Sequence, residues 1–254
     1  MSFLDAVPRH PCPALGGTPV PLRLDSLEAM AAVFGADTAA VRALLPAAGA
    51  SVLAPLQWRP GRCLVSFIAV RYHEGDLGPY DELAVTVPVG RAPLPRLQAL
   101  RDLLRMRFEG FIWQMPVTTE RARDAGVRLA GFPKWVADLR WSEDPRWRRC
   151  SLHTGPGQPE LSLACRVAPG SGPARELSLL SHTLLDGAPV VSELRLRQER
   201  WHEHPGGGGA ELRLGQGPLA DALRALRLGP RPLWTQVVPQ AQALLFAPRS
   251  LGAE

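Results

Sequence analysis

Hydrophobic and polar residues alternate along most of this chain, and the alternation predicts β-strands. Successive side chains of a strand point to opposite faces, so a period of two marks a strand with one buried face. Glycine- and proline-rich turns separate these segments, as at 59–61 and 155–157. Strands at this spacing predict a large, mainly antiparallel sheet that must curl or close. The predicted strands are 51–58, 63–72, 82–89, 110–117, 135–141, 147–153, 160–167, 176–185, 190–198 and 210–214.

Helical patterns are fewer and are recognised by caps and apolar stripes. Asp37, Thr119 and Pro218 are suited to helix starts, and Pro46 ends a helix. Leucines on one stripe, with arginines around them, predict an amphipathic helix near the middle of the chain. We therefore expect a mainly β (α+β) fold with a few peripheral helices. The predicted helices are 38–45, 94–108, one from Thr119 to about residue 129, and 219–226.

Length and composition fit a single domain spanning residues 1–254. Hydrophobic residues make up 46% of the 254, which is enough for a substantial core. The longest apolar runs, such as 29–36 and 43–50, are far shorter than the roughly 20 residues of a membrane span. The N-terminal segment has an aspartate and prolines where a signal peptide has a basic and then an apolar run. We expect a cytoplasmic protein with no membrane partner.

Charge and cysteine usage argue against nucleic-acid and zinc binding. The net charge is +5 and the pI is near 9.5. However, arginines alternate with acids at 121–124 and 193–197, which is not typical of a nucleic-acid surface. No two cysteines have the spacing of metal ligands, so free, mostly buried thiols and no metal site are expected. The cysteines are Cys12, Cys63, Cys150 and Cys165.

Three further features have simple structural interpretations. Residues 215–220 resemble a dinucleotide-binding turn, but no acid follows about 20 positions later, so a turn and helix start is the better interpretation. His202 and His204 have the spacing of two metal ligands on one strand face, but no third ligand is evident, so a solvated loop is expected. His182, in an apolar strand, is predicted to be a hydrogen-bonded core histidine.

Lys134 is the only lysine among the 29 basic residues, and it lies in the apolar segment 131–135. A neutral lysine amine can attack a carbonyl carbon, which an arginine cannot do. Desolvation by apolar neighbours favours the neutral amine. Pro133 cannot continue the preceding helix and places Lys134 at the start of a strand. Lys134 is therefore the candidate nucleophile, although a coding bias toward arginine also explains the scarcity of lysine.

Glu82 opens the apolar strand 82–89 and is the second candidate. A carboxylate in this position orients a substrate or moves protons if it faces a cavity. The spacing alone favours a carboxylate in water at the edge of the sheet.

At these residues the chain resembles the acetoacetate decarboxylase family. The resemblance rests on Pro-Tyr-Asp-Glu at 79–82, Met-Pro-Val at 115–117 and Gly-Phe-Pro-Lys at 131–134. The resemblance extends over most of the chain through further similar segments at 37–46, 186–194 and 212–219. The last of these matches the family's C-terminal strand and turn. The resemblance implies a cone-shaped, closed β-barrel with a buried cavity, no cofactor and a homo-oligomer.

The resemblance also implies roles for individual residues. Lys134 is expected to form a Schiff base with a small-molecule keto acid, and Glu82 to lie beside it in the cavity. Decarboxylating members have a second lysine where this chain has Trp135. The expected substrate-binding residues are Phe67, Met115, Phe132 and Arg23. Phe67 stands at the position of a second family glutamate. Arg23 is the arginine nearest in sequence to the position of a family arginine that meets the substrate carboxylate.

Three functional interpretations follow. The first is a Schiff-base lyase that decarboxylates a β-keto acid, and the second is a pyruvate-type aldolase–dehydratase that uses the same lysine. The third is a non-catalytic keto-acid-binding protein with the same fold. Phe67 and Trp135 replace polar family residues, which predicts a more apolar cavity and a longer or aromatic substrate.

Overall fold

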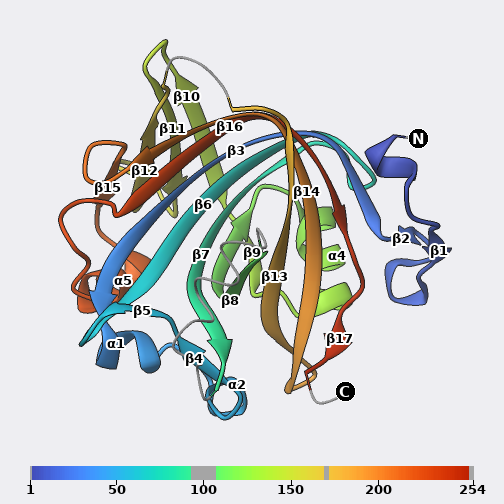
Figure 1. Ribbon diagram of the computed structural model, residues 1–254, viewed down its shortest axis with the longest axis horizontal. Helices are drawn as coiled ribbons and strands as arrows, with labels where there is room; N and C mark the ends of the chain where they lie inside the picture. The colour runs from blue at the N-terminus through green and yellow to red at the C-terminus, as the bar shows by residue number, and fades with distance from the viewer. Residues whose placement is uncertain (1, 93–106, 169–171, 252–254) are drawn as a thin grey trace.

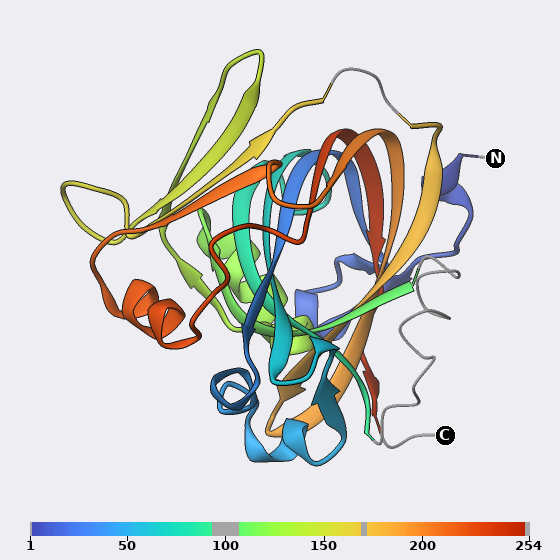
Figure 2. The same ribbon diagram turned by 60° about the vertical axis from the view of Figure 1, so that its left-hand side comes forward.

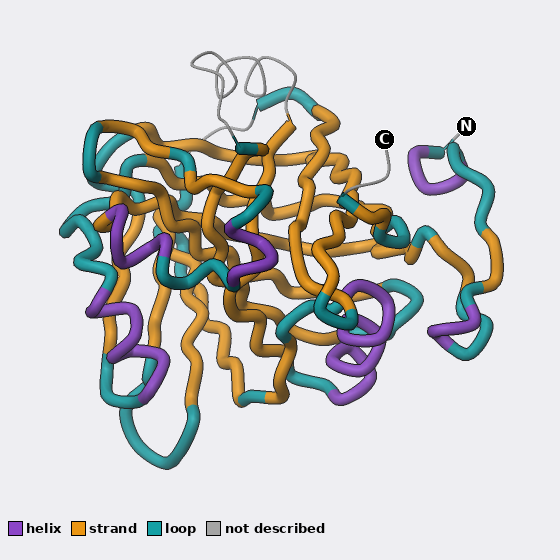
Figure 3. The backbone as a smooth tube through the Cα atoms, turned by 90° about the horizontal axis from the view of Figure 1, so that it is seen from below, coloured by secondary structure: helices purple, strands orange, loops and turns teal. Residues whose placement is uncertain are grey.

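Strands dominate the computed structural model of the protein, which describes residues 2–92, 107–168 and 172–251 (Figure 1). Seen from below, the helices lie at the margins of the strands (Figure 3). The helices are η1 (Phe3–Asp5), η2 (Pro13–Leu15), α1 (Thr38–Arg42), α2 (Ala47–Ala50), α4 (Glu120–Ala130) and α5 (Pro218–Ala225). The strands are β1 (His10–Pro11), β2 (Pro19–Val20), β3 (Leu22–Asp37), β4 (Leu53–Pro55), β5 (Gln57–Arg59), β6 (Arg62–Glu74), β7 (Tyr80–Arg91), β8 (Arg107–Val117), β9 (Lys134–Val136), β10 (Asp138–Glu143), β11 (Trp147–His153), β12 (Leu161–Arg166), β13 (Arg175–Leu185), β14 (Ala188–Pro205), β15 (Ala210–Leu214), β16 (Trp234–Leu245) and β17 (Arg249–Ser250).

Seven of these strands close into a barrel. They pair in the order β7-β6-β3-β16-β14-β13-β8, and β8 pairs with β7 again. The predicted closed, mainly antiparallel sheet is thus confirmed. Two pairings that involve β8, with β13 and with β9, are parallel.

A second sheet, in the order β10-β11-β12-β15, extends from one side of the barrel together with α5 (Figure 2). Its buried face packs against the outer face of β3, β6 and β7. We call this contact the outer core; Phe34, Phe67, Leu83, Leu152 and Leu163 are among its buried members.

The interior of the barrel holds a different set of apolar side chains. This set, which we call the lumen cluster, draws buried residues from all seven barrel strands, so it lines the space that they enclose. Ala122 of α4 joins it, so this helix packs against the lumen. Its buried members are Leu24, Leu27, Val70, Tyr72, Tyr80, Val117, Ala122, Leu177, Leu196, Val238, Ala241 and Ala243.

Two strands of the barrel were not predicted from alternation, β3 and β16. In β3 the buried face changes along the strand, because Leu24 and Leu27 belong to the lumen cluster and Met30, Ala32 and Phe34 to the outer core. In β16 four consecutive positions, 235–238, are buried, so neither strand shows one regular alternation. Because β16 follows α5, the segment 212–219 is not the C-terminal strand and turn that the resemblance implied. The predicted strands 51–58 and 135–141 are each divided into two shorter strands.

The helix predictions hold where the structure describes them. The carboxylate of Asp37 accepts a hydrogen bond from the backbone N–H of Ala40 at 3.0 Å, and Thr119 Oγ1 accepts one from that of Ala122 at 3.2 Å. These are the expected N-caps of α1 and α4. The predicted helix 94–108 falls largely on residues outside the described part of the chain.

The turn at 215–220 begins α5, as predicted, and a side chain of the protein occupies its N-terminus. Buried Glu160 accepts hydrogen bonds at Oε1 from the backbone N–H groups of Leu219 (2.6 Å) and Ala220 (3.2 Å). Thr154 donates to its other oxygen at 2.8 Å. A carboxylate of the chain therefore fills the position at which a nucleotide-binding turn holds a phosphate.

We expect Glu160→Ala to lower the free energy of unfolding by about 3 kcal/mol, because it leaves buried N–H groups without an acceptor. Urea unfolding measures the loss. The control is Glu211→Ala, which removes a half-exposed partner of Arg213 and should cost less than about 1 kcal/mol. Equal losses in the two variants would show that Glu160 does not anchor α5.

Candidate active site

The end of α4 positions the single lysine. Gly131 follows the helix with φ 61°, and a Cβ there would lie 2.0 Å from the carbonyl oxygen of Leu184, so the turn requires glycine. After Phe132 and Pro133, Lys134 begins β9, where it pairs with Met115 of β8. The Gly-Phe-Pro-Lys segment thus converts a helix end into a strand next to the barrel wall.

Lys134 and Glu82 form a buried ion pair. The Nζ atom of Lys134 lies 2.7 Å from Oε2 of Glu82, and their side chains are only 5% and 8% exposed. Glu82 stands on β7, which the pairing of β7 with β8 brings beside Lys134. The expectation that the two residues lie together is met, and the alternative of an edge carboxylate in water is wrong.

Aromatic rings surround the amine. Nζ of Lys134 lies 5.4 Å from the ring centroid of Tyr80 and 5.7 Å from that of Phe132. The faces of these rings attract a cation, whether ammonium or iminium. With water largely excluded, Glu82 is the group that balances either charge.

A pair of tyrosines adjoins the other oxygen of Glu82. Tyr72 donates a long hydrogen bond of 3.5 Å to Oε1 of Glu82, and its ring stacks on that of Tyr80 with centroids 4.4 Å apart. Burial raises the pKa of both tyrosines well above the ordinary value, and Glu82 adds to both shifts. Tyr72 raises the pKa of Tyr80 further, whereas the hydrogen bond with Tyr80 lowers that of Tyr72. Both hydroxyls therefore remain protonated near neutral pH.

Gly126 provides the space that the lysine side chain occupies. It lies on α4, and a Cβ at this position would be 2.6 Å from Cδ and 2.7 Å from Cε of Lys134. A side chain at residue 126 and the observed lysine conformation therefore exclude each other.

We expect Gly126→Ala to displace Lys134 and to reduce imine formation at least tenfold, because a displacement of about 1 Å can cost 100-fold. Alanine is favoured over glycine inside a helix by up to about 1 kcal/mol, which offsets part of the steric cost. The measurement pairs the melting temperature with the rate of borohydride-trapped adduct formation. Wild-type trapping by this variant would contradict the observed lysine position.

Of the other predicted site residues, Met115 and Phe132 lie beside the pair. Met115 is opposite Lys134 in the register of β8 and β9. Met115 and Phe132 belong to one buried cluster with Ala84 and Leu129. Their expected proximity to the nucleophile is therefore met, while a role in substrate binding stays a prediction.

Phe67 is not part of this site. It is fully buried in the outer core, where it packs edge-to-face on Phe34. Alternation along β6 turns Ile68 and Val70 toward the lumen instead, with Val70 directly opposite Glu82. The resemblance placed the second family glutamate at Phe67, one residue before Ile68, which faces the lumen. A shift of one residue reverses the face of a strand.

Trp135 and Arg23 also lie apart from the pair. The Trp135 side chain packs against the outer core and donates from Nε1 to Oε1 of Gln114 at 3.1 Å. Arg23 forms ion pairs with Asp25 at 2.7 Å and Asp5 at 3.3 Å. The predicted apolar cavity therefore rests on Ile68 and Val70 rather than on Phe67 and Trp135.

The remaining candidates have structural roles. His182 is 2% exposed and hydrogen-bonded to Glu109 at 2.9 Å, as predicted for a core histidine. Residues 202–204 belong to β14 and not to a solvated loop. All four cysteines are free thiols, and burial raises the pKa of Cys150 and Cys165 far above the ordinary value. Within the described ranges, no three His, Cys, Asp or Glu side chains gather as a metal site, and no helix is long and apolar enough to cross a membrane.

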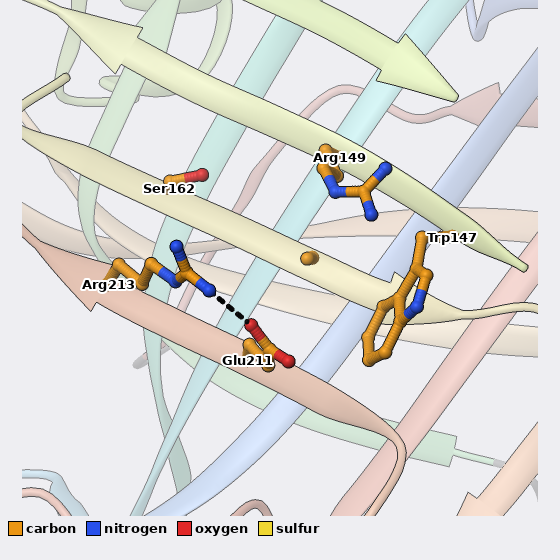
Figure 4. Close-up of a pocket in the computed structure, with 6 residues that line it drawn as sticks. Trp147, Arg149, Ser162, Glu211 and Arg213 are labelled. Atoms are coloured by element: carbon orange, nitrogen blue, oxygen red, sulfur yellow. Dashed lines mark hydrogen bonds and ion pairs between the residues drawn. The ribbon is translucent and has the colours of Figure 1, made fainter. Parts of the chain in front are cut away.

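A hollow of about 210 Å³ lies on the second sheet, away from Lys134 (Figure 4). Its two arginines are neutralised, because Arg149 pairs with Asp144 at 2.6 Å and Arg213 with Glu211 at 3.0 Å. The hollow thus lies on a different sheet from the Lys134–Glu82 pair and holds none of the predicted site residues.

Comparison with known proteins identifies the family and the fold. The family model described as acetoacetate decarboxylase (ADC) matches residues 6–168. The solved acetoacetate decarboxylase of Legionella pneumophila has a TM-score of 0.62 at 17% identity, over 98% of this chain and 93% of that one. The enduracididine biosynthesis enzyme MppR, solved with pyruvate, has a TM-score of 0.56 at 14% identity, over 92% and 91%. No curated protein matches the chain in sequence.

Proposed function

Because the chain belongs to the acetoacetate decarboxylase family, we propose that it is a lyase that decarboxylates a β-keto acid through an imine on Lys134. The observation that carries the proposal is the buried pair, with Nζ of Lys134 at 2.7 Å from Glu82 among aromatic rings. An amine nucleophile needs a base to take its proton and a counter-charge for the iminium that follows, and Glu82 is placed for both.

The proposed reaction balances as follows. Glu82 takes the proton from the ammonium of Lys134, and the free amine adds to the substrate carbonyl. Glu82 returns its proton to the oxygen of the carbinolamine, and loss of water gives an iminium beside the Glu82 carboxylate. The bond between the α-carbon and the substrate carboxylate then breaks, its electron pair passes into the iminium, and CO₂ leaves. The resulting enamine takes a proton at carbon, and water releases the ketone and the free lysine.

The apolar lumen favours this step. A substrate carboxylate loses its hydration among Ile68, Val70 and the aromatic rings, and the transition state toward neutral CO₂ disperses that charge. Tyr72 donates a hydrogen bond to Glu82 and so helps to hold this side chain beside Lys134.

A second candidate is aldol-type condensation through the same lysine. The observation that favours it is Ile68, which faces the lumen where decarboxylating relatives are expected to carry a second carboxylate. A solved MppR complex contains the condensation product of pyruvate and imidazole 4-carboxaldehyde, and that enzyme shares the fold at a TM-score of 0.57. In such a reaction the enamine attacks an aldehyde carbon instead of taking a proton.

Borohydride trapping tests the proposed chemistry. The protein is incubated with acetoacetate, pyruvate or longer keto acids, reduced, and weighed intact by mass spectrometry. Schiff-base chemistry predicts one adduct mass for at least one keto acid. Release of CO₂ without an aldehyde then supports decarboxylation, and a product formed only with an aldehyde supports the aldol reaction. Protein of unmodified mass across a broad keto-acid panel would reject both.

A further inference from the structure

The wall of the barrel opposite Glu82 carries a polar network centred on Arg175. Around the closed sheet, β14 is three pairings from β7 through β8 and β13, and four through β6, β3 and β16. The strands β13 and β14 therefore face β7 across the lumen. Arg175 begins β13, and its direct partners lie on β14, where Gln236 of β16 binds two of them.

Strand alternation turns this network inward. Arg175 shares a strand face with Leu177, Gln198 with Leu196, and Gln236 with Val238; each of these apolar neighbours belongs to the lumen cluster. Gln198 and Gln236 are 1% and 7% exposed. Polar side chains on a buried inner face are expensive unless they are hydrogen-bonded, so their arrangement is specific.

The network holds the guanidinium in a fixed orientation. Nε of Arg175 donates to Oε1 of Gln198 at 2.8 Å, and Nη2 forms an ion pair with Glu203. The guanidinium carbon lies 3.5 Å from the ring centroid of Trp201, which itself packs against the lumen cluster. Gln236 donates to the Glu203 carboxylate at 3.0 Å and so holds the acid in turn.

One edge of the guanidinium remains available. Among the described residues, Nη1 of Arg175 has no hydrogen-bond partner, and the side chain is 22% exposed. An arginine held by two partners and an aromatic face is pre-organised for a further acceptor, because little rotamer entropy remains to be lost. The acceptor that matches a guanidinium edge best is a carboxylate.

The wall between the two polar groups is apolar. Gln236 is paired with Ala31, Ala31 with Ile68, and Ile68 with Ala84, two residues from Glu82 on the same face of β7. Such a row of apolar side chains suits a hydrocarbon spacer.

We propose that Arg175 binds a second, distal carboxylate of the substrate, so that the preferred ligand is an oxo-dicarboxylate with its carbonyl at Lys134. The position of the ligand's carbonyl end rests on the proposed Schiff-base function. The binding of its distal carboxylate depends on the Arg175 network and can be tested without imine chemistry.

The first test compares ligands that cannot form an imine. Thermal melting of the full chain is followed with glutarate and with pentanoate, which have equal chain length and differ by one carboxylate. We expect glutarate to raise the melting temperature of the wild-type protein at concentrations at least tenfold lower than pentanoate does. One additional charge-assisted hydrogen bond accounts for a ratio of about that size. Equal responses of the wild type to the two acids would overturn the proposal.

Variants connect any preference to the residue. Arg175→Gln is expected to remove the glutarate preference and leave the pentanoate response unchanged. Arg175→Lys retains the charge and the pair with Glu203 without the planar fork, so it should reduce the preference and still fold. Arg197→Gln is the matched control, because Arg197 lies on the outer face of β14, paired with Glu199 at 2.5 Å. A glutarate preference that survives in folded Arg175→Gln would also overturn the proposal.

The second test adds the carbonyl. Half-saturation of borohydride trapping is compared for 2-oxoglutarate and 2-oxopentanoate. A wild-type preference of at least tenfold for 2-oxoglutarate, absent in Arg175→Gln, supports the proposed substrate class. Equal half-saturation for the two acids rejects it. An adduct with neither acid, together with a glutarate shift in melting, would refute the Schiff-base function and leave Arg175 as a carboxylate site.

Discussion

Lys134→Arg is expected to abolish the borohydride-trapped adduct completely. Because Lys134 is the only lysine, the amines available for an imine in the wild-type protein are Lys134 and the N-terminal amine. Arginine keeps a positive charge beside Glu82, but its guanidinium does not lose a proton and does not add to a carbonyl. Intact-mass measurement of both proteins after reduction therefore distinguishes Lys134 from the N-terminal amine.

The comparison with Lys134→Ala separates chemistry from stability. Alanine leaves Glu82 buried without a counter-ion, which costs about 3–5 kcal/mol when one partner of a buried pair is removed. Arginine retains a partner and should cost less. Both variants are expected to lose the adduct, and Lys134→Ala should also unfold at lower urea concentration. An adduct of wild-type yield in Lys134→Arg would assign the imine to the N-terminus and refute the proposed nucleophile.

Much of the barrel could be predicted from the sequence because most of its strands either alternate or, like β7, form a short apolar run, and glycine or proline lies in many of the turns between them. In β3 the buried face changes along the strand, from Leu24 and Leu27 in the lumen cluster to Met30 and Ala32 in the outer core, with a bulge at Ser26. In β16 four consecutive positions are buried. Periodicity alone does not distinguish such a run from a buried helix.

The site was only partly predictable for a related reason. Lys134 and Glu82 lie in segments with recognisable residue order, so they could be identified without knowledge of their contacts. The face of Phe67 depended on the strand register, which a one-residue difference in the β6–β7 turn changes. Gly126 and Tyr72 carry no motif; their importance follows from contacts with Lys134 and Glu82 that only the folded chain reveals.

Arg175 gave no sequence signal either, because the residues that hold it are dispersed: Gln198 and Glu203 lie on β14, and Gln236, which binds both, lies on β16. We expected a solvated loop at 202–204, because no third metal ligand was evident there. The structure places a β-bulge there: the register of β14 against β16 shifts between Arg200 and His202. A bulge redirects side chains, which fits the inward position of Glu203.

Glu82→Gln is expected to separate imine formation from the later proton transfers. Glutamine keeps the size of the side chain and its contact with Tyr72 but is neither a base nor a counter-ion. We expect adduct yield after long incubation to remain, because the amine can still reach a carbonyl. Deuterium exchange at the carbon next to that carbonyl, which requires the enamine, should fall by about 100- to 10,000-fold.

The exchange is measured by proton NMR with pyruvate or 2-oxobutyrate in D₂O, so it does not depend on knowing the natural substrate. Asp81→Asn is the matched control, because Asp81 neighbours Glu82 on β7 and pairs with Arg71 at 3.3 Å, on the opposite face of the strand. It should exchange at the wild-type rate. If Glu82→Gln also exchanged at the wild-type rate, another group would be the base. The contact between Glu82 and Lys134 would then contribute to stability alone, and the variant would differ from the wild type in its urea midpoint but not in its exchange rate.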